Sequence, residues 1–470
     1  MIFHKEKERK RRMQKTYVLD TNVLIQAPYA LDRFEDNHIV LPLAVLEELD
    51  GLKNADGERG GNARQVIRRL EELRRRGSLV DGVDLPGGGS LRLEVNHVGV
   101  PLPDGMDPHS PDSRILKVCK GLMDDGVSAI LVTRDIVARI KAQMMGVAAE
   151  DFTADQVSDP ARQYTGREDV YVPNDLLAGF KKKSLDAKSL YKVDEAGQRL
   201  PVALTENEFL ILRSDTDEKK TLLGRYRGGK VLPLHSAGVR PFGVHARSVG
   251  QQFLQEALML SAKEAPLVVV KGPAGTAKTF YALAVGLEKT LEQEEKEYRK
   301  ILVCRPNAQF DQDIGFLPGS EQEKISPLLR PIADNLEILL DLDKKKDKER
   351  RSEEELRGRI DYLFETGVIT AEAMNFMRGR SITDTWLMID EAQNLTPRQV
   401  KGIITRVGEG TKVILLGDPE QIDHPLLDRQ SNGLSYASER MLDSPLCVQL
   451  TMRSDECERS ALALDAAERM

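Results

Sequence analysis

Short apolar runs alternate with amphipathic stretches in two parts of this chain, residues 16–155 and residues 241–470. In the first part these runs are 17–19, 39–41 and 129–132. In the last part they are 267–270, 301–303, 386–389 and 412–416. Brief, continuous apolar runs bounded by amphipathic stretches predict buried parallel strands joined by helices. Each of the two parts is therefore predicted to be an α/β domain.

Other segments follow different patterns. Val66, Leu70 and Leu73 recur at helical spacing, and Gly77 is expected to end that helix. The Gly/Pro-rich stretch 81–89 predicts a loop, and the charged run 341–359 predicts a solvated helix or an insertion. Residues 156–240 have strand character at 170–172, 208–212 and 221–227 with poor helical periodicity, which predicts either a small β-rich domain or a long ordered linker.

Composition narrows the class of protein. A chain of 470 residues is too long for one ordinary core, so two or three domains are expected. Hydrophobic content of 40% and charged content of 30% suit a soluble protein, and no apolar run reaches membrane-span length. The charged first 15 residues do not resemble a secretory signal. Four cysteines without a CxxC pair predict neither disulfides nor zinc, which favours the cytoplasm.

Charge also limits the partners. A net charge of −7 excludes a uniformly basic surface for nucleic acid. Basic runs at 5–15, 68–76 and 181–183 are typical of solvated tails and helix faces. An alternative interpretation is that the run 181–183, together with Arg225, Tyr226 and Arg227, contacts an RNA backbone.

The strongest chemical signal follows the run 267–270. A strand, a glycine-containing loop and a helix over 280–291 come in the order of a phosphate-binding loop, which predicts binding of ATP. Lys278 is expected to reach the β and γ phosphates, and the Thr279 hydroxyl to ligate Mg²⁺. Ala277 stands where the motif has its second glycine, so its methyl group is expected to crowd the phosphates or resist the required φ. The loop reads Gly272-Pro273-Ala274-Gly275-Thr276-Ala277-Lys278-Thr279.

Two further strands end in polar residues. The run 386–389 leads into Asp390 and Glu391, which predicts that Asp390 holds Mg²⁺ and that Glu391 polarises the attacking water. The run ending at Leu416 leads into Asp418 and Gln421, where Gln421 is expected to sense the γ phosphate. Arg459 is a candidate for stabilising the transferred phosphoryl group, with a surface helix arginine as its alternative. Gln251, just before an apolar helix over 253–260, is placed to read adenine.

These residues resemble the PhoH family of ATPases, which is similar to the core of superfamily 1 RNA helicases. The resemblance covers roughly residues 245–465 and implies a single RecA-like lobe, RNA as partner and a homo-oligomeric ring in which Arg459 or another arginine acts across a subunit boundary. Its motifs are 272–279, 305–306, 313–319, 378–380, 390–394, 405–406, 417–423 and 458–460.

Acidic residues mark the N-terminal domain. Asp20 follows the run 17–19, Glu48 lies in an amphipathic stretch over 43–52, and Asp135 follows the run 129–132. Asp112 opens a helix after Pro111, where its alternative role is that of an N-cap. Four carboxylates without nearby cations repel one another unless a divalent ion binds among them. Mg²⁺ or Mn²⁺ in such a cluster can activate water for phosphodiester hydrolysis.

The acids resemble the metal-binding set of a PIN ribonuclease domain over residues 16–152. The resemblance implies Asp20, Glu48, Asp112 and Asp135 as metal ligands and catalytic residues, with Asn22 and Thr133 as supports. It favours Glu48 over Glu47, because the family acid directly precedes an apolar residue, here Leu49. The two glutamates remain interchangeable at this stage.

Two functions are compatible with these motifs. The first is an ATP-dependent RNA-processing enzyme, in which a PhoH-type ATPase moves or unwinds single-stranded RNA and a PIN domain cuts it. The second is an ATP-switched module that binds RNA or protein through a PIN fold that does not cut. The presence of all four expected acids favours cleavage, whereas Ala277 argues against rapid ATP turnover.

Overall fold

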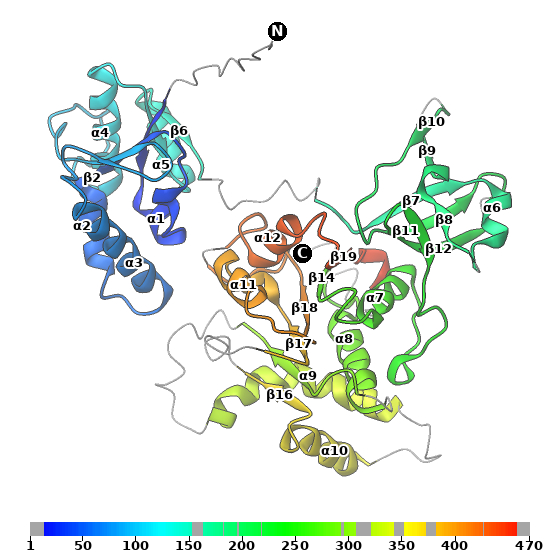
Figure 1. Cartoon of the computed structure of the whole chain (residues 1–470). Helices are drawn as coiled ribbons and strands as arrows, with labels where there is room; N and C mark the ends of the chain where they lie inside the picture. Colours follow the sequence, from blue (N-terminus) through cyan, green and yellow to red (C-terminus); the bar gives the residue numbers. More distant parts are fainter. Residues whose placement is uncertain are drawn as a thin grey trace, which may run out of the picture. The chain divides into compact units, whose positions relative to one another are not determined.

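The protein is described by a computed structural model, in which the described residues form two compact units (Figure 1). The first unit comprises residues 14–152, and the second comprises all described residues from 163 onward. The described ranges are 14–152, 163–181, 183–194, 197–217, 219–292, 296–306, 321–342, 352–372, 382–425 and 427–457.

The first unit is built on a six-stranded sheet of order β3-β4-β2-β1-β5-β6, parallel except for the β3–β4 pair. Its strands are β1 (Thr16–Leu19), β2 (His38–Pro42), β3 (Val83–Asp84), β4 (Ser90–Glu94), β5 (Ala129–Val132) and β6 (Ala148–Glu150). Its helices are α1 (Thr21–Gln26), η1 (Ala30–Asp32), α2 (Leu43–Leu52), α3 (Gly57–Arg74), α4 (Pro111–Asp124) and α5 (Ile136–Met144). The prediction of a loop over 81–89 was wrong for β3, where Val83 is buried and pairs with Leu91.

Residues 163–240 fold as a β domain, which decides between the two predicted alternatives. Their seven-stranded sheet has the order β10-β9-β7-β11-β12-β13-β8 and is antiparallel except for the β7–β11 pair. Phe180, Leu210 and Val231 lie in its small core. The strands are β7 (Arg167–Val172), β8 (Leu185–Asp186), β9 (Tyr191–Val193), β10 (Arg199–Pro201), β11 (Phe209–Ser214), β12 (Thr221–Arg227) and β13 (Lys230–Pro233). The helices are α6 (Asn174–Gly179), η3 (Ala187–Ser189) and, after β13, η4 (Pro241–Gly243).

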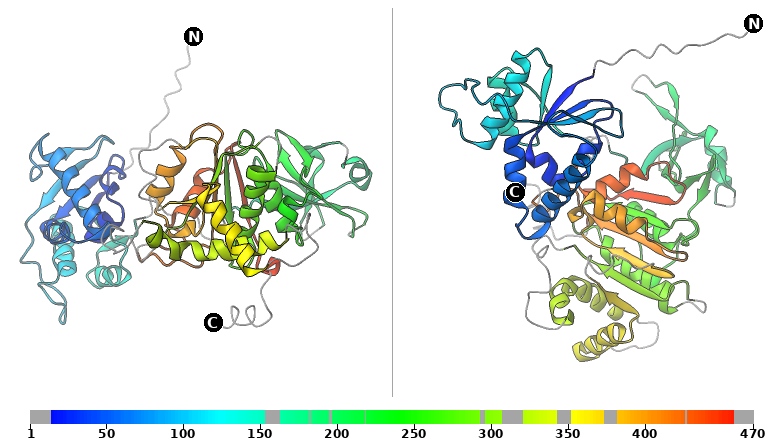
Figure 2. Two further views of the ribbon diagram at one scale, coloured as in Figure 1. Left: turned by 90° about the horizontal axis from the view of Figure 1, so that it is seen from below. Right: turned by 60° about the vertical axis from the view of Figure 1, so that its left-hand side comes forward.

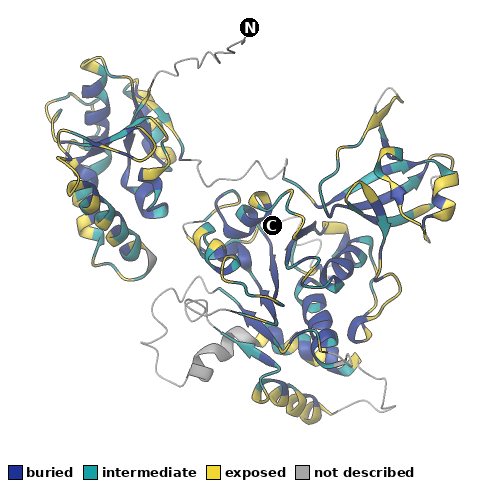
Figure 3. Ribbon diagram, viewed as in Figure 1, coloured by how far each residue is buried: buried dark blue, intermediate teal, exposed yellow. Residues whose placement is uncertain are grey.

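The C-terminal domain has a six-stranded parallel sheet of order β16-β15-β17-β18-β14-β19. Its inner strands are mostly dark blue in Figure 3, since apolar side chains bury both faces, whereas the edge strand β16 is only partly buried and α10 is largely exposed. The strands are β14 (Leu267–Lys271), β15 (Lys300–Cys304), β16 (Ile369–Ala371), β17 (Thr385–Ile389), β18 (Lys412–Gly417) and β19 (Cys447–Thr451). The helices are α7 (Val249–Met259), α8 (Lys278–Leu287), η5 (Glu288–Glu292), α9 (Glu321–Leu342), α10 (Glu353–Glu365), η8 (Ala392–Asn394), α11 (Pro397–Ile404), α12 (Gly433–Arg440) and η9 (Ser454–Glu456).

The β domain is joined to the edge of this parallel sheet. The Thr451 amide of β19, the edge strand beside β14, donates to the Thr165 carbonyl at 2.7 Å. The Arg167 Nη1 atom donates to both carboxylate oxygens of Glu456, each at 2.9 Å, and both side chains are almost fully buried. The Gly250 amide at the start of α7 donates to the same carboxylate at 2.7 Å. The second unit is therefore held together by buried polar contacts as well as by apolar packing.

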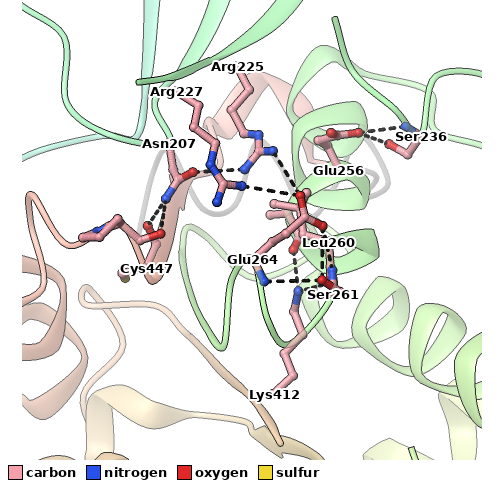
Figure 4. Close-up of polar contacts among 12 residues, drawn as sticks. Asn207, Arg225, Arg227, Ser236, Glu256, Leu260, Ser261, Glu264, Lys412 and Cys447 are labelled. Atoms are coloured by element: carbon pink, nitrogen blue, oxygen red, sulfur yellow. Dashed lines mark hydrogen bonds and ion pairs between the residues drawn. The ribbon is translucent and has the colours of Figure 1, made fainter. Parts of the chain in front are cut away.

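A second group of contacts joins the same two domains (Figure 4). Arg225 is fully buried and donates to the Asn207 side chain at 3.0 Å, while Asn207 donates to the Cys447 carbonyl at the start of β19. Arg227 pairs with Glu264 of the loop before β14 at 3.4 Å. Arg225 is therefore an interface residue, so the prediction of a solvated surface was wrong for it, and its alternative, contact with an RNA backbone, is excluded by its burial.

The two further views in Figure 2 show the helices of the first unit and of the C-terminal domain packed on the faces of their own sheets. None of the described helices is long and apolar enough to cross a membrane.

Candidate nucleotide site and acidic site

The predicted phosphate-binding loop connects β14 to α8. Gly272 has φ 148°, and a Cβ there would lie 2.7 Å from the Met452 Cβ, so the loop leaves the sheet where only glycine fits. Gly275 has φ 87°. Ala277, the N-cap of α8, has φ 63° and ψ 23°. It therefore adopts the left-handed conformation, which is usually occupied by glycine. The backbone therefore takes the shape expected of the motif despite the missing glycine.

Lys278 begins α8 and turns its ammonium group back into the loop. Its Nζ donates to the Gly272 carbonyl at 2.6 Å and to the Pro273 carbonyl at 2.9 Å. Burial lowers its pKa, and the negative charges of Asp418 and Asp390 oppose that shift. These loop carbonyls hold the ammonium where it can meet an anionic ligand.

Thr279 and Asp390 are brought together from α8 and the end of β17. The Thr279 hydroxyl donates to Asp390 Oδ1 at 2.9 Å across 111 positions of sequence. Burial raises the pKa of Asp390, and the neighbouring Glu391 carboxylate raises it further. A hydroxyl and a buried carboxylate facing each other beside a phosphate-binding loop match the donor pair that P-loop proteins use for Mg²⁺. The residues present therefore fit a nucleotide with its magnesium ion.

Glu391 is held in place by two neighbours. Arg305, just after β15, donates to its Oε1 at 3.0 Å, and Gln393 donates to its Oε2 at 2.7 Å. Gln393 also accepts from the Asp418 amide at 3.1 Å, and donates to the Gln421 carbonyl at 2.8 Å. The loops after β15, β17 and β18 are thus tied together at one edge of the sheet. Sequence reasoning gave Arg305 and Gln393 no individual role, although each follows a predicted strand.

The remaining predicted nucleotide residues differ in their placement. Asp418 is buried after β18, but the Gln421 side chain is exposed. Gln251 is almost fully buried, and its Oε1 accepts from the Arg247 amide at 2.7 Å, so that its amide oxygen is engaged within the protein. Adenine recognition by Gln251 stays a prediction. Arg459, with the motifs at 313–319, 378–380 and 458–460, lies outside the described residues.

The acidic site of the first unit centres on Asp20, which lies between β1 and α1 and is 6% exposed. Its Oδ2 accepts from the Thr133 hydroxyl and from the Asn22 amide, each at 2.6 Å. Burial raises the pKa of Asp20, and the nearby Asp112 and Glu48 carboxylates raise it as well, partly opposed by the Thr133 bond. Both supporting residues expected from the sequence therefore contact Asp20.

The structure separates the two adjacent glutamates of α2. Glu48 accepts from the Thr21 hydroxyl at 2.5 Å, which places its carboxylate beside Asp20. Glu47 instead forms an ion pair with Arg114. This geometry favours Glu48 as the member of the acidic site.

Asp112 and Asp135 have local partners that the sequence did not reveal. Asp112 pairs with Lys141 of α5 at 2.9 Å, so the premise that no cation lies near the acids was wrong. The N-cap of α4 is Ser110, which excludes that role for Asp112. Asp135 is the N-cap of α5, where its Oδ1 accepts from the Val137 and Ala138 amides.

The four carboxylates are not arranged as a preformed metal site. Their carboxylate oxygens fit Mg²⁺ or Mn²⁺ by type. Within the described ranges, however, no group of three His, Cys, Asp or Glu side chains is close enough to hold a metal ion. Asp20, Glu48 and Asp112 are close enough to influence one another electrostatically. A bound cation would have to draw these side chains together and displace Lys141 from Asp112.

Comparison with known proteins identifies both halves of the chain. Residues 17–153 match the model of the PIN domain, and residues 243–469 match that of the PhoH-like protein family. Protein PhoH2 of Bacillus subtilis is 39% identical over 97% of this chain and 100% of its own length. Protein PhoH2 of Mycolicibacterium smegmatis is 32% identical over 97% of each chain, and that of Thermobispora bispora is 31% identical over 96% of this chain and 95% of its own. The chain therefore belongs to the PhoH2 family, with a PIN domain at its N-terminus and a PhoH-like P-loop NTPase domain at its C-terminus.

Proposed function

We propose that this protein is an ATP-dependent RNA-processing enzyme. Its PhoH-like domain hydrolyses ATP and moves or unwinds single-stranded RNA, and its PIN domain cuts that RNA in a metal-dependent reaction. The observation that carries the proposal is the hydrogen bond from Thr279 to Asp390 beside Lys278. It pairs the two expected magnesium ligands at the expected loop. Membership of the PhoH2 family supports the combination of the two activities.

In the ATPase, each residue of the loop has a separate task. The backbone amides of residues 272–279 and Lys278 bind the phosphates, while Thr279 and Asp390 hold Mg²⁺. Magnesium, when bound, neutralises charge on the phosphate oxygens. Glu391 orients and polarises the attacking water, and its bonds from Arg305 and Gln393 keep its carboxylate in place. Gln421 and Arg459 are proposed to contact the γ phosphate.

In the PIN domain, Asp20, Glu48, Asp112 and Asp135 are proposed as ligands of Mg²⁺ or Mn²⁺. The metal, when bound, supplies an activated water and stabilises the leaving oxygen of the phosphodiester. Thr133 and Asn22 fix the Asp20 carboxylate by donating to the same oxygen.

The second candidate, an ATP-switched binding module, has one observation in its favour. Lys141 already neutralises Asp112 at 2.9 Å, as expected of a PIN fold that no longer binds metal. Cleavage then requires Lys141 to leave Asp112. The substitution Lys141→Gln distinguishes the candidates, because it frees Asp112 and should raise cleavage at low Mn²⁺ if the domain cuts.

Assembly and location are part of the proposal. A single RecA-like lobe lacks the second lobe that helicases use to close the nucleotide site, so a homo-oligomeric ring that supplies Arg459 from a neighbouring subunit is proposed. The four cysteines are free and three are buried, which supports a reducing compartment, the cytoplasm.

The test is a paired assay on the whole chain. ATP hydrolysis is measured with and without single-stranded RNA, and cleavage of labelled RNA is measured with Mg²⁺ or Mn²⁺. Lys278→Ala should lose ATP binding, Glu391→Gln should bind ATP without hydrolysing it, and Asp20→Asn should lose cleavage while keeping ATPase activity. Full ATPase activity in the first two variants would refute the ATP site. Undiminished cleavage by Asp20→Asn would refute the nuclease assignment.

A further inference from the structure

One edge of the β domain carries lysines that lack acidic partners. Lys181 and Lys183 follow α6, Lys188 lies in η3 just after β8, and Lys230 begins β13. All four side chains are exposed. In the described part of the chain, none of them forms an ion pair. We call these residues the lysine edge.

Strand pairing brings the lysine edge together. Strand β8 is the last strand of the sheet and pairs with β13, so that Lys230 lies opposite Asp186. Lys183 and Lys188 each lie two residues from β8, on either side of it. The Ala187 amide donates to the Gly229 carbonyl at 3.0 Å, which fixes η3 beside the β12–β13 turn. Lys188 and Lys230 thus lie at one end of the β8–β13 pair, and Lys181 and Lys183 precede its other end, so that all four lysines belong to the same edge of the sheet although they span 50 positions of sequence.

Several cations elsewhere in the same domain are paired with acids. At the other side of the sheet, Lys192 pairs with Glu168 at 2.8 Å and Arg213 with Asp169 at 2.7 Å. The acids close to the lysine edge, Asp186 and Glu206, instead accept from backbone amides. The lysine edge therefore keeps an excess of positive charge in a molecule whose net charge is negative.

The surface between the lysines is open and polar. Gly228 and Gly229 form the adjacent turn with φ 57° and 82°, and a Cβ on either would meet no atom within 4 Å. Ser184 is exposed, whereas the apolar neighbours Leu185 and Val231 are buried. A flexible chain of phosphates can approach such a surface closely, and hydroxyl and ammonium groups are the usual donors to phosphate oxygens. A membrane surface would also need exposed apolar side chains, and the two named neighbours do not provide them.

We infer that the lysine edge is a binding surface for the sugar-phosphate backbone of single-stranded RNA, independent of base sequence. The inference deepens the proposed function, because it rests on RNA being the partner and names where the β domain holds it. The buried Arg167–Glu456 pair and the contacts in Figure 4 fix this domain to the sheet that carries the phosphate-binding loop. RNA held at the lysine edge therefore stays at a constant position relative to the ATP site.

The inference makes a quantitative prediction about salt. Each lysine that neutralises a phosphate of a single strand adds about 0.7 to the slope of log affinity against log salt. The variant with Lys181→Gln, Lys183→Gln, Lys188→Gln and Lys230→Gln should therefore have a slope lower by about 3. Between 50 and 200 mM salt, the parent should lose about 50-fold more affinity than this variant.

The experiment is fluorescence anisotropy of labelled oligouridylate and oligoadenylate with the full chain in EDTA, so that cleavage does not interfere. Lys192→Gln is the matched control, since Lys192 is a half-exposed lysine in the same domain that is paired with Glu168, and the slope of this variant should equal that of the parent. Thermal unfolding checks that all variants fold. Equal binding of both RNAs with the reduced slope supports the inference.

Three results would contradict it in distinguishable ways. A slope in the four-lysine variant equal to that of the parent overturns the surface while leaving the proposed function standing. Binding to phosphatidylserine vesicles but not to RNA assigns the lysine edge to a membrane. A parent that binds neither RNA and whose ATPase does not respond to RNA removes the proposed function itself.

Discussion

Ala277→Gly tests whether the left-handed residue in the phosphate-binding loop is strained. Ala277 has φ 63°, where an L-residue with a Cβ costs roughly 1–2 kcal/mol relative to glycine. Glycine also gains freedom in the unfolded chain, which removes about 0.4–1 kcal/mol of that benefit. The net expectation is that the variant is more stable by about 0.5–1 kcal/mol. For a domain of this size, the midpoint of thermal unfolding should rise by about 1–4 °C.

The matched control lies three residues earlier in the same loop. Ala274 is not among the described residues with a left-handed backbone, so Ala274→Gly relieves no strain and only adds freedom to the unfolded chain. Its stability should fall by about 0.4–1 kcal/mol. The same chemical change is thus expected to have opposite signs at two positions. Calorimetry or guanidinium unfolding of the full chain measures both.

ATP affinity gives a second readout for Ala277→Gly. The left-handed conformation is already present without nucleotide, so relieving its strain should stabilise the free and bound proteins equally. The Kd for ATP, measured by titration with a fluorescent analogue, should then stay within about two-fold of the parent, which is under about 0.5 kcal/mol. A markedly tighter Kd would mean that the free loop does not hold this conformation. A loss of stability equal to that of Ala274→Gly would refute the strain argument.

Three further predictions concern buried charges. Burial raises the pKa of Glu208 from 4.5 to about 7, so its contribution to stability is greatest below about pH 4.5 and is lost as pH rises through 7. Glu208→Gln should therefore gain up to about 3 kcal/mol at pH 8 and nothing at pH 4, by guanidinium unfolding. Arg167→Met leaves the Glu456 carboxylate buried without its cation and should lower the free energy of unfolding by about 3–5 kcal/mol in the same assay. Arg199→Met, which removes the cation of a more exposed pair, should lower it by less than about 1 kcal/mol. Because the folded pKa of Asp20 is raised by burial, Asp20→Asn should stabilise the metal-free protein at pH 7, and a thermal scan should show this gain shrinking as pH falls toward 4.

The sequence predicted the elements whose side chains repeat a pattern. The run 267–270 became β14 (Leu267–Lys271), because a continuous apolar run can be satisfied only inside a sheet covered on both faces. Strand β3 was missed because two residues are too few to show any periodicity. Thr279 and Asp390 were each predicted as a magnesium ligand, and their side chains lie close together because the carboxyl ends of parallel strands meet at one edge of a sheet.

The errors concern contacts that only tertiary structure creates. Lys141 and Asp112 lie 29 positions apart on different helices, and no local pattern shows that their side chains meet. Arg225 was expected at the surface because charged residues are rarely buried, yet it is buried between the two domains, where it donates to Asn207 of the β10–β11 connection. A sequence pattern detects which face of an element is apolar, but it does not detect which polar residues another domain covers.

The contacts between the β domain and the parallel sheet also connect the β domain to the phosphate-binding loop. Glu456, which holds Arg167, is followed directly by Cys457, whose thiol donates to the Ala274 carbonyl in the phosphate-binding loop at 3.1 Å. The same short segment therefore touches the β domain on one side and the ATP site on the other. Such a connection transmits force only if its ends are fixed, and the buried Arg167–Glu456 pair fixes the first end. A displacement of the phosphate-binding loop on ATP binding would therefore act on this segment and on the buried Arg167–Glu456 pair that joins the two domains.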